Sequence, residues 1–446
     1  MGPRTMDKII LKELIAGGMN VARFNFSHGS YEEHAERIAL VRQVSEQLGI
    51  PVALMLDTKG PELRIKEGDE TGCSITYQQL VYDVRKGDTI LIDDGLIGLE
   101  VQRVSADKIE CIIKNGGELG ERKGVNVPNV KIHLPGVTQK DREDILFGIE
   151  QGVDYIAASF VRNSDCIMDI REILEDNHGR DIGIIAKIEN AEGVENIDEI
   201  LDAADGIMVA RGDLGVEIPA DQVPHIQKKI IHKCNRKCKP VVTATQMLDS
   251  MIRNPRPTRA EAGDVANAIY DGSDAIMLSG ETAMGKYPVE AVRMMAKIAE
   301  TTEAHLDYSN LQKLNKKQRK KDISMAVGFA SVSTAEILKA SCLVVPTMTG
   351  YTARMISSLR PKTPIYAISP SEQAVRRMQL YWGVYAMPGE TEDSTRHMIT
   401  NSMKIILRRK LIKKGELAVF TAGDPATNMV SGRGRSTNVM QVVEAK

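Results

Sequence analysis

The sequence predicts an α/β protein whose largest part is a (β/α)8 TIM barrel. Seven short apolar, β-branched runs alternate with amphipathic helical stretches, which is the pattern of parallel βαβ units. A turn-rich segment interrupts this alternation, and new strand and helix alternation follows near the carboxyl end. With 446 residues, the chain is long enough for these parts to form separate domains.

The expected barrel strands are nearly continuous apolar runs, as required when both faces of a strand are covered. Helical stretches lie between most of them, for example at residues 31–48 and 139–152. A helix expected at residues 6–16 follows Met1-Gly2-Pro3 directly, so the sequence lacks the first of the eight strands. The seven expected strands fall at residues 21–26, 52–57, 155–160, 184–189, 206–211, 241–246 and 275–280.

The interruption is predicted to be an all-β domain, inserted after the third-strand position. Because it enters at the carboxyl end of the barrel, where loops build active sites, we expect it to act as a lid. Its strands are expected at residues 73–77, 89–92, 98–104 and 108–113. The third domain is expected to have strands at 342–347, 364–369, 383–388, 416–422 and 438–443. The predicted domains are the barrel (1–62 and 134–308), the β-barrel lid (63–133) and a carboxy-terminal α/β regulatory domain (309–446).

Composition excludes several classes of protein. With 42% hydrophobic and 26% charged residues, the chain is not of the disordered class. Its 58 Lys and Arg balance 60 Asp and Glu, so no overall field attracts nucleic acid, and the basic run 315–321 is interpreted as a solvated connection. Six scattered cysteines fit a reducing compartment. No apolar run reaches the about 18 residues of a membrane span. We expect a cytoplasmic protein without nucleic-acid or membrane partners.

Charged residues gather at the expected carboxyl ends of the barrel strands. Lys187 and Glu189 are two apart on one strand, so both point to the same face, and Asp213 follows the neighbouring strand. Two carboxylates with water and substrate oxygens form a typical Mg²⁺ or Mn²⁺ site. The alternative is a buried structural ion pair between Lys187 and Glu189. The strand ends also supply Ser159, Arg162, Arg211, Gln246, Ser279 and Glu281.

A second set of strand-end residues offers oxygen ligands with only one formal negative charge. This donor set suits a weakly bound monovalent cation, and the alternative is a hydrogen-bonded cluster without an ion. Arg23 and Arg64 can hold phosphate oxygens as forked donors, and Lys187 can place a point charge on a transferring group. These cations indicate phosphoryl transfer. The oxygen ligands of the second set are Asn25, Ser27, Asp57 and Thr58.

These residues lie in segments that closely resemble the pyruvate kinase family. The resemblance covers most of the chain in the right order, and it implies a (β/α)8 barrel, a β-barrel lid and a carboxy-terminal α/β domain. It also implies transfer of the phosphoryl group of phosphoenolpyruvate to ADP, giving ATP and pyruvate. The matching segments are MNVARFNFSHG (19–29), LDTKGPELR (56–64), KGVNVP (123–128), ASFVR (158–162), AKIEN (186–190), ARGDLGVE (210–217), TATQML (243–248), NPRPTRAE (254–261) and SGETAMGKYP (279–288).

The resemblance assigns roles on the substrate side of the site. Glu189 and Asp213 would hold Mg²⁺ (or Mn²⁺), and Lys187 would stabilise the phosphoryl group and the enolate. Arg23 would bridge phosphate groups. The substrate carboxylate would bind the backbone of Gly212 and Asp213 and the hydroxyl of Thr245, which would also lie in the proton path from enolpyruvate to pyruvate.

The resemblance also indicates which residues would bind the monovalent cation and the nucleotide. Glu62 occupies the position that goes with potassium dependence in the family. Contacts to the nucleotide would come from His28, Arg64 and Lys123. The residues that match the K⁺ ligands are Asn25, Ser27, Asp57 and Thr58.

The third domain contains a hydroxyl-rich turn between an expected strand and a helix. Such a turn can cradle a phosphate at a helix amino terminus, and the resemblance implies a sugar-phosphate effector there and a homotetramer. Tyr351 is larger than the small or basic residue often found at its position, so a plain helix cap is the alternative. The residues of the cradle are Thr347, Thr349, Gly350 and Thr352.

The sequence departs from the family pattern at its amino end. A family member would carry a first strand ending in Thr-Ile-Gly-Pro, of which Gly2 and Pro3 are present. Because a lost strand exposes two sheet edges, we expect lower stability or activity than with the strand restored. Another enzyme class, a metal-dependent lyase or aldolase, explains Glu189 and Asp213 but not the lid or third domain. A non-catalytic regulatory chain agrees less well with the complete set of site residues.

Overall fold

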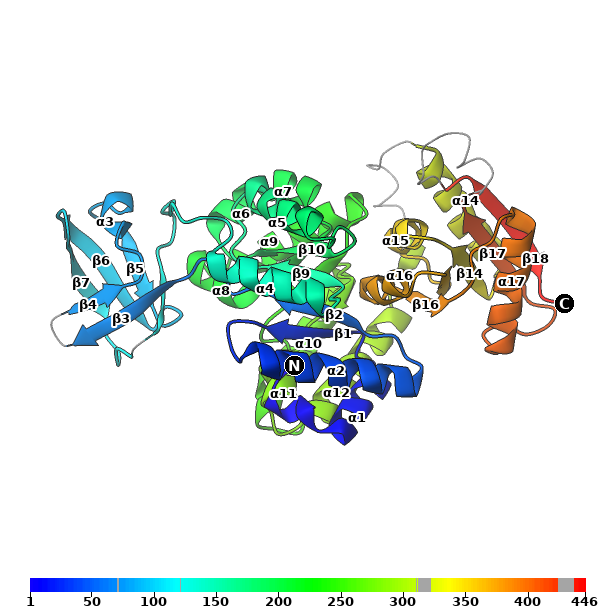
Figure 1. Cartoon of the computed structure of the whole chain (residues 1–446), viewed down its shortest axis with the longest axis horizontal. Helices are drawn as coiled ribbons and strands as arrows, with labels where there is room; N and C mark the ends of the chain where they lie inside the picture. The colour runs from blue at the N-terminus through cyan, green and yellow to red at the C-terminus, as the bar shows by residue number, and fades with distance from the viewer. Residues whose placement is uncertain (70–71, 121, 310, 312–321, 424–436) are drawn as a thin grey trace.

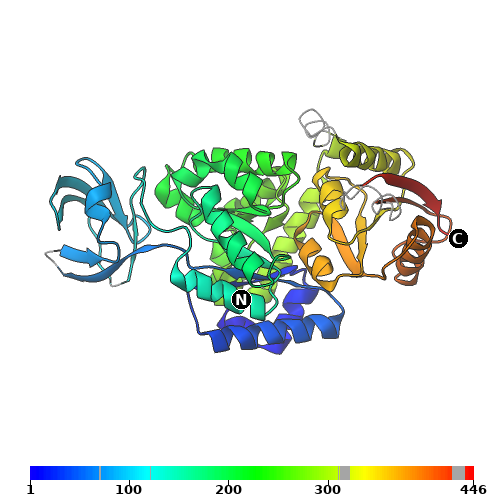
Figure 2. The same cartoon turned by 45° about the horizontal axis from the view of Figure 1, so that its top comes forward.

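The computed structural model describes residues 1–69, 72–120, 122–309, 311, 322–423 and 437–446, which form three units in a row (Figure 1). The barrel unit lies in the middle, with the lid on one side and the carboxy-terminal domain on the other, and the turned view in Figure 2 keeps this order. The basic run 315–321 lies outside the described residues. Among the helices that are described, none is long and apolar enough to cross a membrane.

Seven parallel strands form the sheet of the barrel unit, one in each of the predicted runs, so the predicted α/β class is confirmed. Neighbours follow the chain order, and β1 and β13 are the two edges in the described part of the chain. Strands β9 and β12 end earlier than predicted because Phe160 (φ 53°), Thr245 (φ 69°) and Gln246 (φ 52°) turn the chain out of the extended conformation. The strands are β1 (Val21–Asn25), β2 (Ala53–Asp57), β9 (Tyr155–Ala158), β10 (Gly183–Ile188), β11 (Gly206–Ala210), β12 (Val241–Ala244) and β13 (Ala275–Ile276).

The helices of the barrel unit begin and end at recognisable capping residues. The side chain of Ser30 accepts a hydrogen bond at the start of α2, and Gly49 (φ 62°) ends that helix. Capping boxes at Thr138 and Thr258 start α4 and α10. The elements are η1 (Pro3–Met6), α1 (Lys8–Ala16), α2 (Tyr31–Leu48), α4 (Gln139–Glu150), α5 (Ser164–Asp176), α6 (Ala191–Glu195), α7 (Ile197–Ala203), α8 (Arg211–Glu217), α9 (Val223–Arg236), η2 (Asp249–Ile252), α10 (Arg259–Tyr270), α11 (Gly280–Ala283) and α12 (Pro288–Ala304).

The lid is a six-stranded antiparallel sheet with a hydrophobic core of its own, which confirms the predicted all-β insert. The sequence pattern missed two of its strands, β3 and β8. They pair with each other, Leu63 opposite Val125 and Arg64 opposite Gly124. The lid elements are β3 (Leu63–Asp69), β4 (Gly72–Ile75), α3 (Leu80–Asp83), β5 (Thr89–Ile92), β6 (Ile97–Val104), β7 (Ile109–Asn115) and β8 (Gly124–Asn126).

The carboxy-terminal domain is a five-stranded sheet in the order β16-β15-β14-β17-β18. All five predicted strands are present, and the last one, β18, runs antiparallel to β17, a direction that the sequence pattern did not predict. The elements are α14 (Ile323–Ile337), β14 (Cys342–Pro346), α15 (Tyr351–Ser358), β15 (Ile365–Ser369), α16 (Glu372–Arg377), η3 (Met378–Leu380), β16 (Val384–Pro388), α17 (Thr395–Arg408), β17 (Leu417–Ala422) and β18 (Val439–Glu444).

Buried cations join the carboxy-terminal domain to the barrel. Arg360, which is 1% exposed, pairs with Asp274 at 2.9 Å and donates to Asn235 Oδ1 at 2.8 Å and to the Gly272 carbonyl at 2.7 Å. The Trp382 ring lies 4.9 Å from its guanidinium group. An ion pair buried with these hydrogen bonds restricts the two domains to one arrangement.

A second contact supports the same interface from another side of the barrel. Asp154 is fully buried at the start of β9, where it accepts hydrogen bonds from Arg376 Nε at 2.9 Å and from the Leu54 amide at 2.8 Å. Burial raises the pKa of Asp154, while Arg376 and Arg42 oppose that shift. The next residue, Tyr155, donates its hydroxyl to the Arg377 carbonyl at 2.7 Å.

Replacing Arg360 by Met should lower the free energy of unfolding by about 3 to 5 kcal/mol, because Asp274 would stay buried without its cation. Urea denaturation followed by the fluorescence of Trp382, the single tryptophan, measures the change. The exposed Arg409→Met serves as the matched control and should change stability by less than about 0.5 kcal/mol. Equal denaturation midpoints for Arg360→Met and Arg409→Met would contradict this account of the interface.

Candidate active site

The polar side chains at the carboxyl ends of the barrel strands lie together at one end of the barrel, its mouth. Asn25 lies opposite Asp57 at the ends of β1 and β2, and Lys187 lies opposite Met208 on β10 and β11. Parallel strands have their carboxyl ends at the same edge of the sheet, so residues far apart in the chain meet there. The residues brought together by direct contacts are Arg23, Asp57, Ser159, Lys187, Glu189 and Asp213.

Lys187 is the centre of this group. Its Nζ lies 2.8 Å from Glu189 Oε1, 2.8 Å from Ser159 Oγ and 3.1 Å from Asp57 Oδ1. The residue is only 9% exposed. Burial alone would lower the pKa of Lys187, but Asp57 and Glu189 outweigh it and raise that pKa above its usual value. The side chain therefore stays a cation inside the mouth.

Glu189 and Asp213 place two carboxylates beside that cation. Burial, partly opposed by Lys187, raises the pKa of Glu189 to about 7, and Asp213 adds to this rise. Burial also raises the pKa of Asp213, whose side chain is hydrogen-bonded to Glu189. The raised pKa values show that Lys187 does not fully offset the cost of burying two carboxylates, and their hard oxygens are the donors that Mg²⁺ and Mn²⁺ prefer. The pair therefore fits the predicted divalent cation.

The predicted monovalent-cation residues lie at the adjacent ends of β1 and β2. Asp57 is paired with both Arg23 and Lys187. Burial would raise the pKa of Asp57, but Arg23 and Lys187 lower it below the usual value. Asn25 Oδ1 accepts the Ser27 amide at 3.0 Å, and Thr58 Oγ1 accepts the Ser159 amide at 3.1 Å. Hydrogen bonds and ion pairs within the protein thus hold the side chains of Asn25, Asp57 and Thr58 in place.

Thr245 and Gly212 face each other at the ends of β12 and β11. The Gly212 amide donates to Thr245 Oγ1 at 2.7 Å, and that hydroxyl donates to the Ala244 carbonyl at 2.6 Å. Thr245 has a φ of 69°, a conformation that costs a β-branched residue energy and must be imposed by its surroundings. Arg211 holds the turn, because its guanidinium group donates to the Thr245 carbonyl at 2.7 Å and pairs with Asp264 at 2.7 Å.

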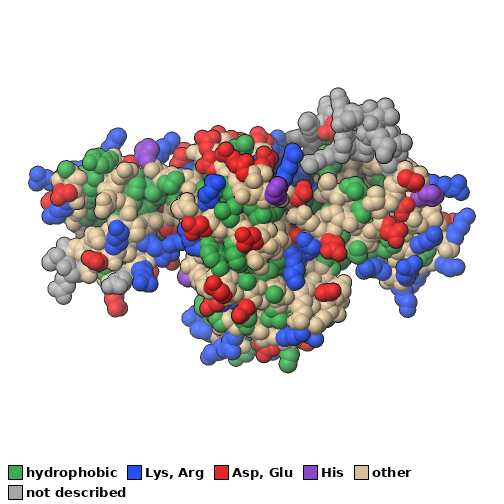
Figure 3. All heavy atoms as spheres, viewed as in Figure 1, with side chains coloured by type: hydrophobic (Ala, Val, Ile, Leu, Met, Phe, Trp, Pro, Cys, Tyr) green, Lys and Arg blue, Asp and Glu red, His purple; other side chains and the backbone are tan. Residues whose placement is uncertain are grey.

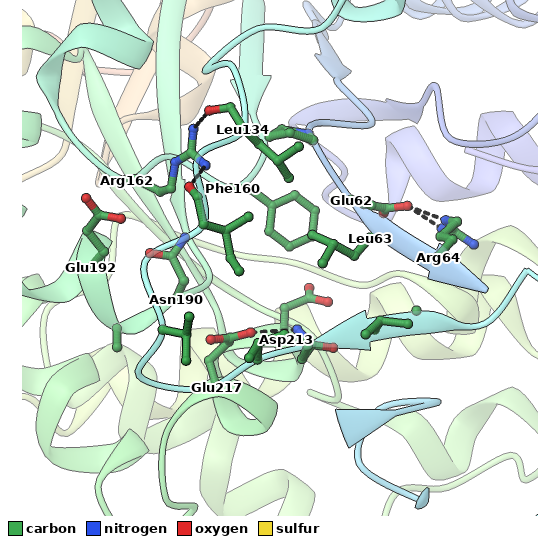
Figure 4. A pocket seen from close by; sticks show the side chains of 18 of the residues that line it. Glu62, Leu63, Arg64, Leu134, Phe160, Arg162, Asn190, Glu192, Asp213 and Glu217 are labelled. Atoms are coloured by element: carbon green, nitrogen blue, oxygen red, sulfur yellow. Dashed lines mark hydrogen bonds and ion pairs between the residues drawn. The ribbon is translucent and has the colours of Figure 1, made fainter. Parts of the chain in front are cut away.

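A cavity of about 460 Å³ lies between the lid and the barrel mouth (Figure 4). Arg64, Lys123 and Asp213 line it, whereas His28, an exposed residue of the loop after β1, does not. Both lid cations have acidic partners: Arg64 pairs at 2.5 Å with Glu62, which directly precedes the lid, and Lys123 pairs at 2.9 Å with Asp93 of the lid. The structure thus brings two of the three predicted nucleotide residues beside a predicted metal ligand.

The predicted effector turn between β14 and α15 uses its hydroxyls in the fold. Thr347 Oγ1 accepts the Gly350 amide at 3.1 Å, and Thr352 Oγ1 lies 2.9 Å from Thr437 Oγ1. A cavity of about 360 Å³ beside the turn is lined by Thr347, Thr349, Thr352 and two carboxylates. These carboxylates, Glu390 and Glu392, oppose an anionic ligand, and the described lining includes no Lys, Arg or His.

Surface charge supports local rather than global recognition of phosphate. Figure 3 shows both cationic and anionic side chains on the lid, the barrel and the carboxy-terminal domain. This mixture agrees with a formal net charge of -2 for the whole chain.

Comparisons with known proteins agree with this geometry. The family model described as the pyruvate kinase barrel domain matches residues 1–74 and 65–292, and that of the pyruvate kinase alpha/beta domain matches residues 325–443. A curated pyruvate kinase from Geobacillus stearothermophilus is 51% identical over 468 aligned positions, covering 99% of this chain and 78% of the relative. One from Clostridium acetobutylicum is 48% identical and covers 99% of this chain and 97% of the relative. The chain belongs to the pyruvate kinase family.

Membership of the pyruvate kinase family confirms the resemblance found in the sequence, and it makes the chain a phosphotransferase. The predicted barrel and carboxy-terminal α/β domain are confirmed by the two family models and by the sheets of the structure. The lyase interpretation and the non-catalytic interpretation lose their support.

Several residues of this pyruvate kinase site had no role in the sequence analysis. Ser159 and Arg211 were noted only as polar residues at strand ends, and their place at the carboxyl end of a strand was the only feature that pointed to the site. The Phe160 amide, which donates to Glu189 Oε2 at 2.6 Å, carries no signal in the sequence. Glu217 contacts the lid through Asn126, and that contact depends on how the domains are arranged.

Replacing Ser159 by Ala should lower kcat about tenfold, because Lys187 loses a charge-assisted hydrogen bond that orients its ammonium group. Steady-state kinetics measure kcat, and a thermal melt checks that the variant is folded. The control is Ser331→Ala, which removes a buried hydroxyl bonded to the Val327 carbonyl in α14, far from the mouth. If both variants keep the kcat of the unaltered protein, Ser159 does not orient Lys187.

Proposed function

We propose that this chain transfers the phosphoryl group of phosphoenolpyruvate to ADP, giving ATP and pyruvate, at the mouth around Lys187. The observation that supports the proposal is a buried Lys187 cation held between Glu189 and Asp57, while Asp213, which is bonded to Glu189, lines the cavity beneath the lid. Phosphoryl transfer needs positioned cations more than covalent chemistry, and this mouth supplies them.

Substrate binding is assigned to the residues around the two carboxylates. Arg23 would bridge the phosphate groups, and Lys187 would hold an oxygen of the transferring group through its ammonium protons. The Gly212 and Asp213 amides and the Thr245 hydroxyl would bind the substrate carboxylate. The 2.7 Å separation of the Gly212 amide and Thr245 Oγ1 supports this, because an incoming carboxylate oxygen could accept from both groups once it replaces Thr245 Oγ1 and the Ala244 carbonyl as their acceptors.

Two cations complete the proposed site. Glu189 and Asp213 would hold Mg²⁺ or Mn²⁺, which stabilises negative charge on the substrate oxygens during transfer. The oxygens of Asn25, Ser27, Asp57 and Thr58 would hold K⁺, as hard ligands with one formal negative charge. Glu62 next to the site supports potassium dependence on the family pattern. Pairing with Asp57 and Glu189 keeps Lys187 charged despite its burial, so it would screen the enolate as it forms.

The nucleotide is assigned to the lid side of the mouth. Arg64 and Lys123 would bind the phosphates of ADP, which would then replace Glu62 and Asp93 as their partners. His28 would contact the nucleotide from the barrel loop. After transfer, Thr245 would deliver the proton that turns enolpyruvate into pyruvate, since its hydroxyl lies in the same turn as the substrate carboxylate site.

The remaining assignments concern the setting of the enzyme. A sugar-phosphate effector at Thr347, Thr349, Gly350 and Thr352 stays a prediction, and the plain helix cap remains its alternative. The homotetramer is proposed from the family pattern. The cytoplasmic location is proposed from the six scattered cysteines, which fit a reducing compartment.

The proposed reaction is tested by supplying phosphoenolpyruvate, ADP and Mg²⁺ and measuring ATP and pyruvate together. Equal amounts of both products are expected, and Lys187→Met should lower kcat by about a thousandfold or more, because the developing charge loses its buried cation. Lys8→Met, a surface change in α1, is the control and should keep full activity. Formation of pyruvate without ATP by the unaltered chain would refute phosphoryl transfer to ADP.

Potassium dependence is tested with the same assay in K⁺ and in a bulky organic cation. Activity should require K⁺, and Ser27→Ala should raise the K⁺ concentration for half activation about tenfold, since one oxygen ligand is removed. Ser105→Ala, whose hydroxyl bonds the Lys108 carbonyl within the lid, should leave that concentration unchanged. Full activity without K⁺ would contradict the assignment of the cluster.

The effector prediction is tested by adding a sugar phosphate while phosphoenolpyruvate is varied. If the turn is an effector site, half saturation should shift and Thr349→Ala should abolish the shift. Thr391→Ala, which changes another threonine that lines the same cavity, is the matched comparison. An unchanged saturation curve would assign the turn to helix capping alone.

A further inference from the structure

A hydrogen bond between side chains connects the lid to the barrel. Asn126 Nδ2 donates to Glu217 Oε1 at 2.8 Å, and Figure 4 shows Glu217 pointing toward the lid strand across the cavity. Asn126 is the last residue of β8 in the lid, and Glu217 is the last residue of α8 in the barrel unit. Both side chains are half-buried, so the bond is sheltered from water.

On the barrel side, this bond reaches the substrate machinery through one short helix. Helix α8 begins with Arg211, Gly212 and Asp213 and ends with Glu217. Leu214 on this helix is fully buried, which fixes its orientation on the barrel. A shift of Glu217 would therefore move α8, the helix that also carries Gly212 and Asp213.

On the lid side, the bond reaches the nucleotide residues through β8. Lys123 directly precedes this strand, and Gly124 on it pairs with Arg64 of β3. The next residue, Val125, is buried in the lid core and lies opposite Leu63 and Ile92. Asn126 thus extends from the strand that connects both predicted nucleotide cations to the lid core.

We propose that Asn126 and Glu217 are a pair of positioning residues whose hydrogen bond holds the lid over the substrate during phosphoryl transfer. This inference rests on the proposed function of the mouth. The bond sets the lid cations above the carboxylate pair and keeps bulk water out of the 460 Å³ cavity between them.

Loss of the bond has a chemical consequence that can be measured. When the lid is loose, water can take the place of ADP as the acceptor. The bond between the phosphorus and the enol oxygen of phosphoenolpyruvate then breaks, and the water oxygen forms the new bond to phosphorus. The attacking water gives up one proton and becomes part of inorganic phosphate, and the released enolate takes up one proton to give pyruvate. Pyruvate therefore forms without ATP, and the ratio of the two products reports on lid position.

The test compares Asn126→Ala and Glu217→Ala with Glu217→Gln, whose amide oxygen still accepts from Asn126. Both alanine variants should raise the KM for ADP about tenfold and yield more pyruvate than ATP, with inorganic phosphate making up the difference. Glu217→Gln should keep equal products and a KM for ADP near that of the unaltered chain. Asn115→Ala, which removes a hydrogen bond of 2.7 Å to the Leu96 carbonyl within the lid, is the matched control and should also keep both.

Three results would overturn the inference. One is equal pyruvate and ATP with an unchanged KM for ADP in both alanine variants. Another is an Asn115→Ala variant that forms as much pyruvate without ATP as Asn126→Ala does, which would assign the effect to general loosening of the lid. The third is a Glu217→Gln variant that behaves like Glu217→Ala. Failure of the proposed function is distinct, because the unaltered chain itself would then make no ATP.

Discussion

The mouth of this pyruvate kinase family member depends on one constraint, the burial of the Lys187 cation in a place where it must find anions. Three oxygens within 3.1 Å, from Glu189, Ser159 and Asp57, compensate for the water that its ammonium group has lost. Those oxygens come from three strands, so the charge also fixes how the strand ends lie relative to one another. Asp57 in turn holds Arg23, and Glu189 holds the Phe160 amide. A single desolvated charge thus organises the cations and carboxylates to which we assign phosphoryl transfer.

The same physics holds the domains around that mouth. Arg360 is buried between the carboxy-terminal domain and the barrel, and its partners come from the end of α9 and from the loop before β13. In the lid, by contrast, the cations Arg64 and Lys123 are only partly buried and pair with Glu62 and Asp93, which are themselves partly exposed. Burial makes the Arg360 pair hard to exchange, whereas partly solvated pairs can exchange their partners for a phosphate at small cost. The Arg360 pair and the pairs made by Arg64 and Lys123 thus differ in solvent exposure rather than in residue type.

Much of the fold could be predicted because its local signals are strong. Covered parallel strands appear in the sequence as continuous apolar runs, and caps such as Ser30 and Thr138 mark helix starts. The strands β3 and β8 escaped prediction because their apolar residues are few, and their pairing joins segments about sixty residues apart. The early ends of β9 and β12 escaped it too, since positive φ values at Phe160 and Thr245 are imposed by tertiary contacts and not by the preferences of these residues.

By itself, the sequence determined the strand order of the barrel, the chemistry available at each strand end and the resemblance to the family, because these depend on residue type and spacing along the chain. Only the tertiary structure decided which groups touch: that Ser159 supports Lys187, that Arg211 holds the Thr245 turn, that His28 lies outside the lid cavity, and that Asn126 reaches Glu217. Contacts between distant segments depend on domain placement and on backbone groups, and neither leaves a local pattern in the sequence. The physical reason is that a side chain carries its own chemistry, whereas its partners are supplied by the fold.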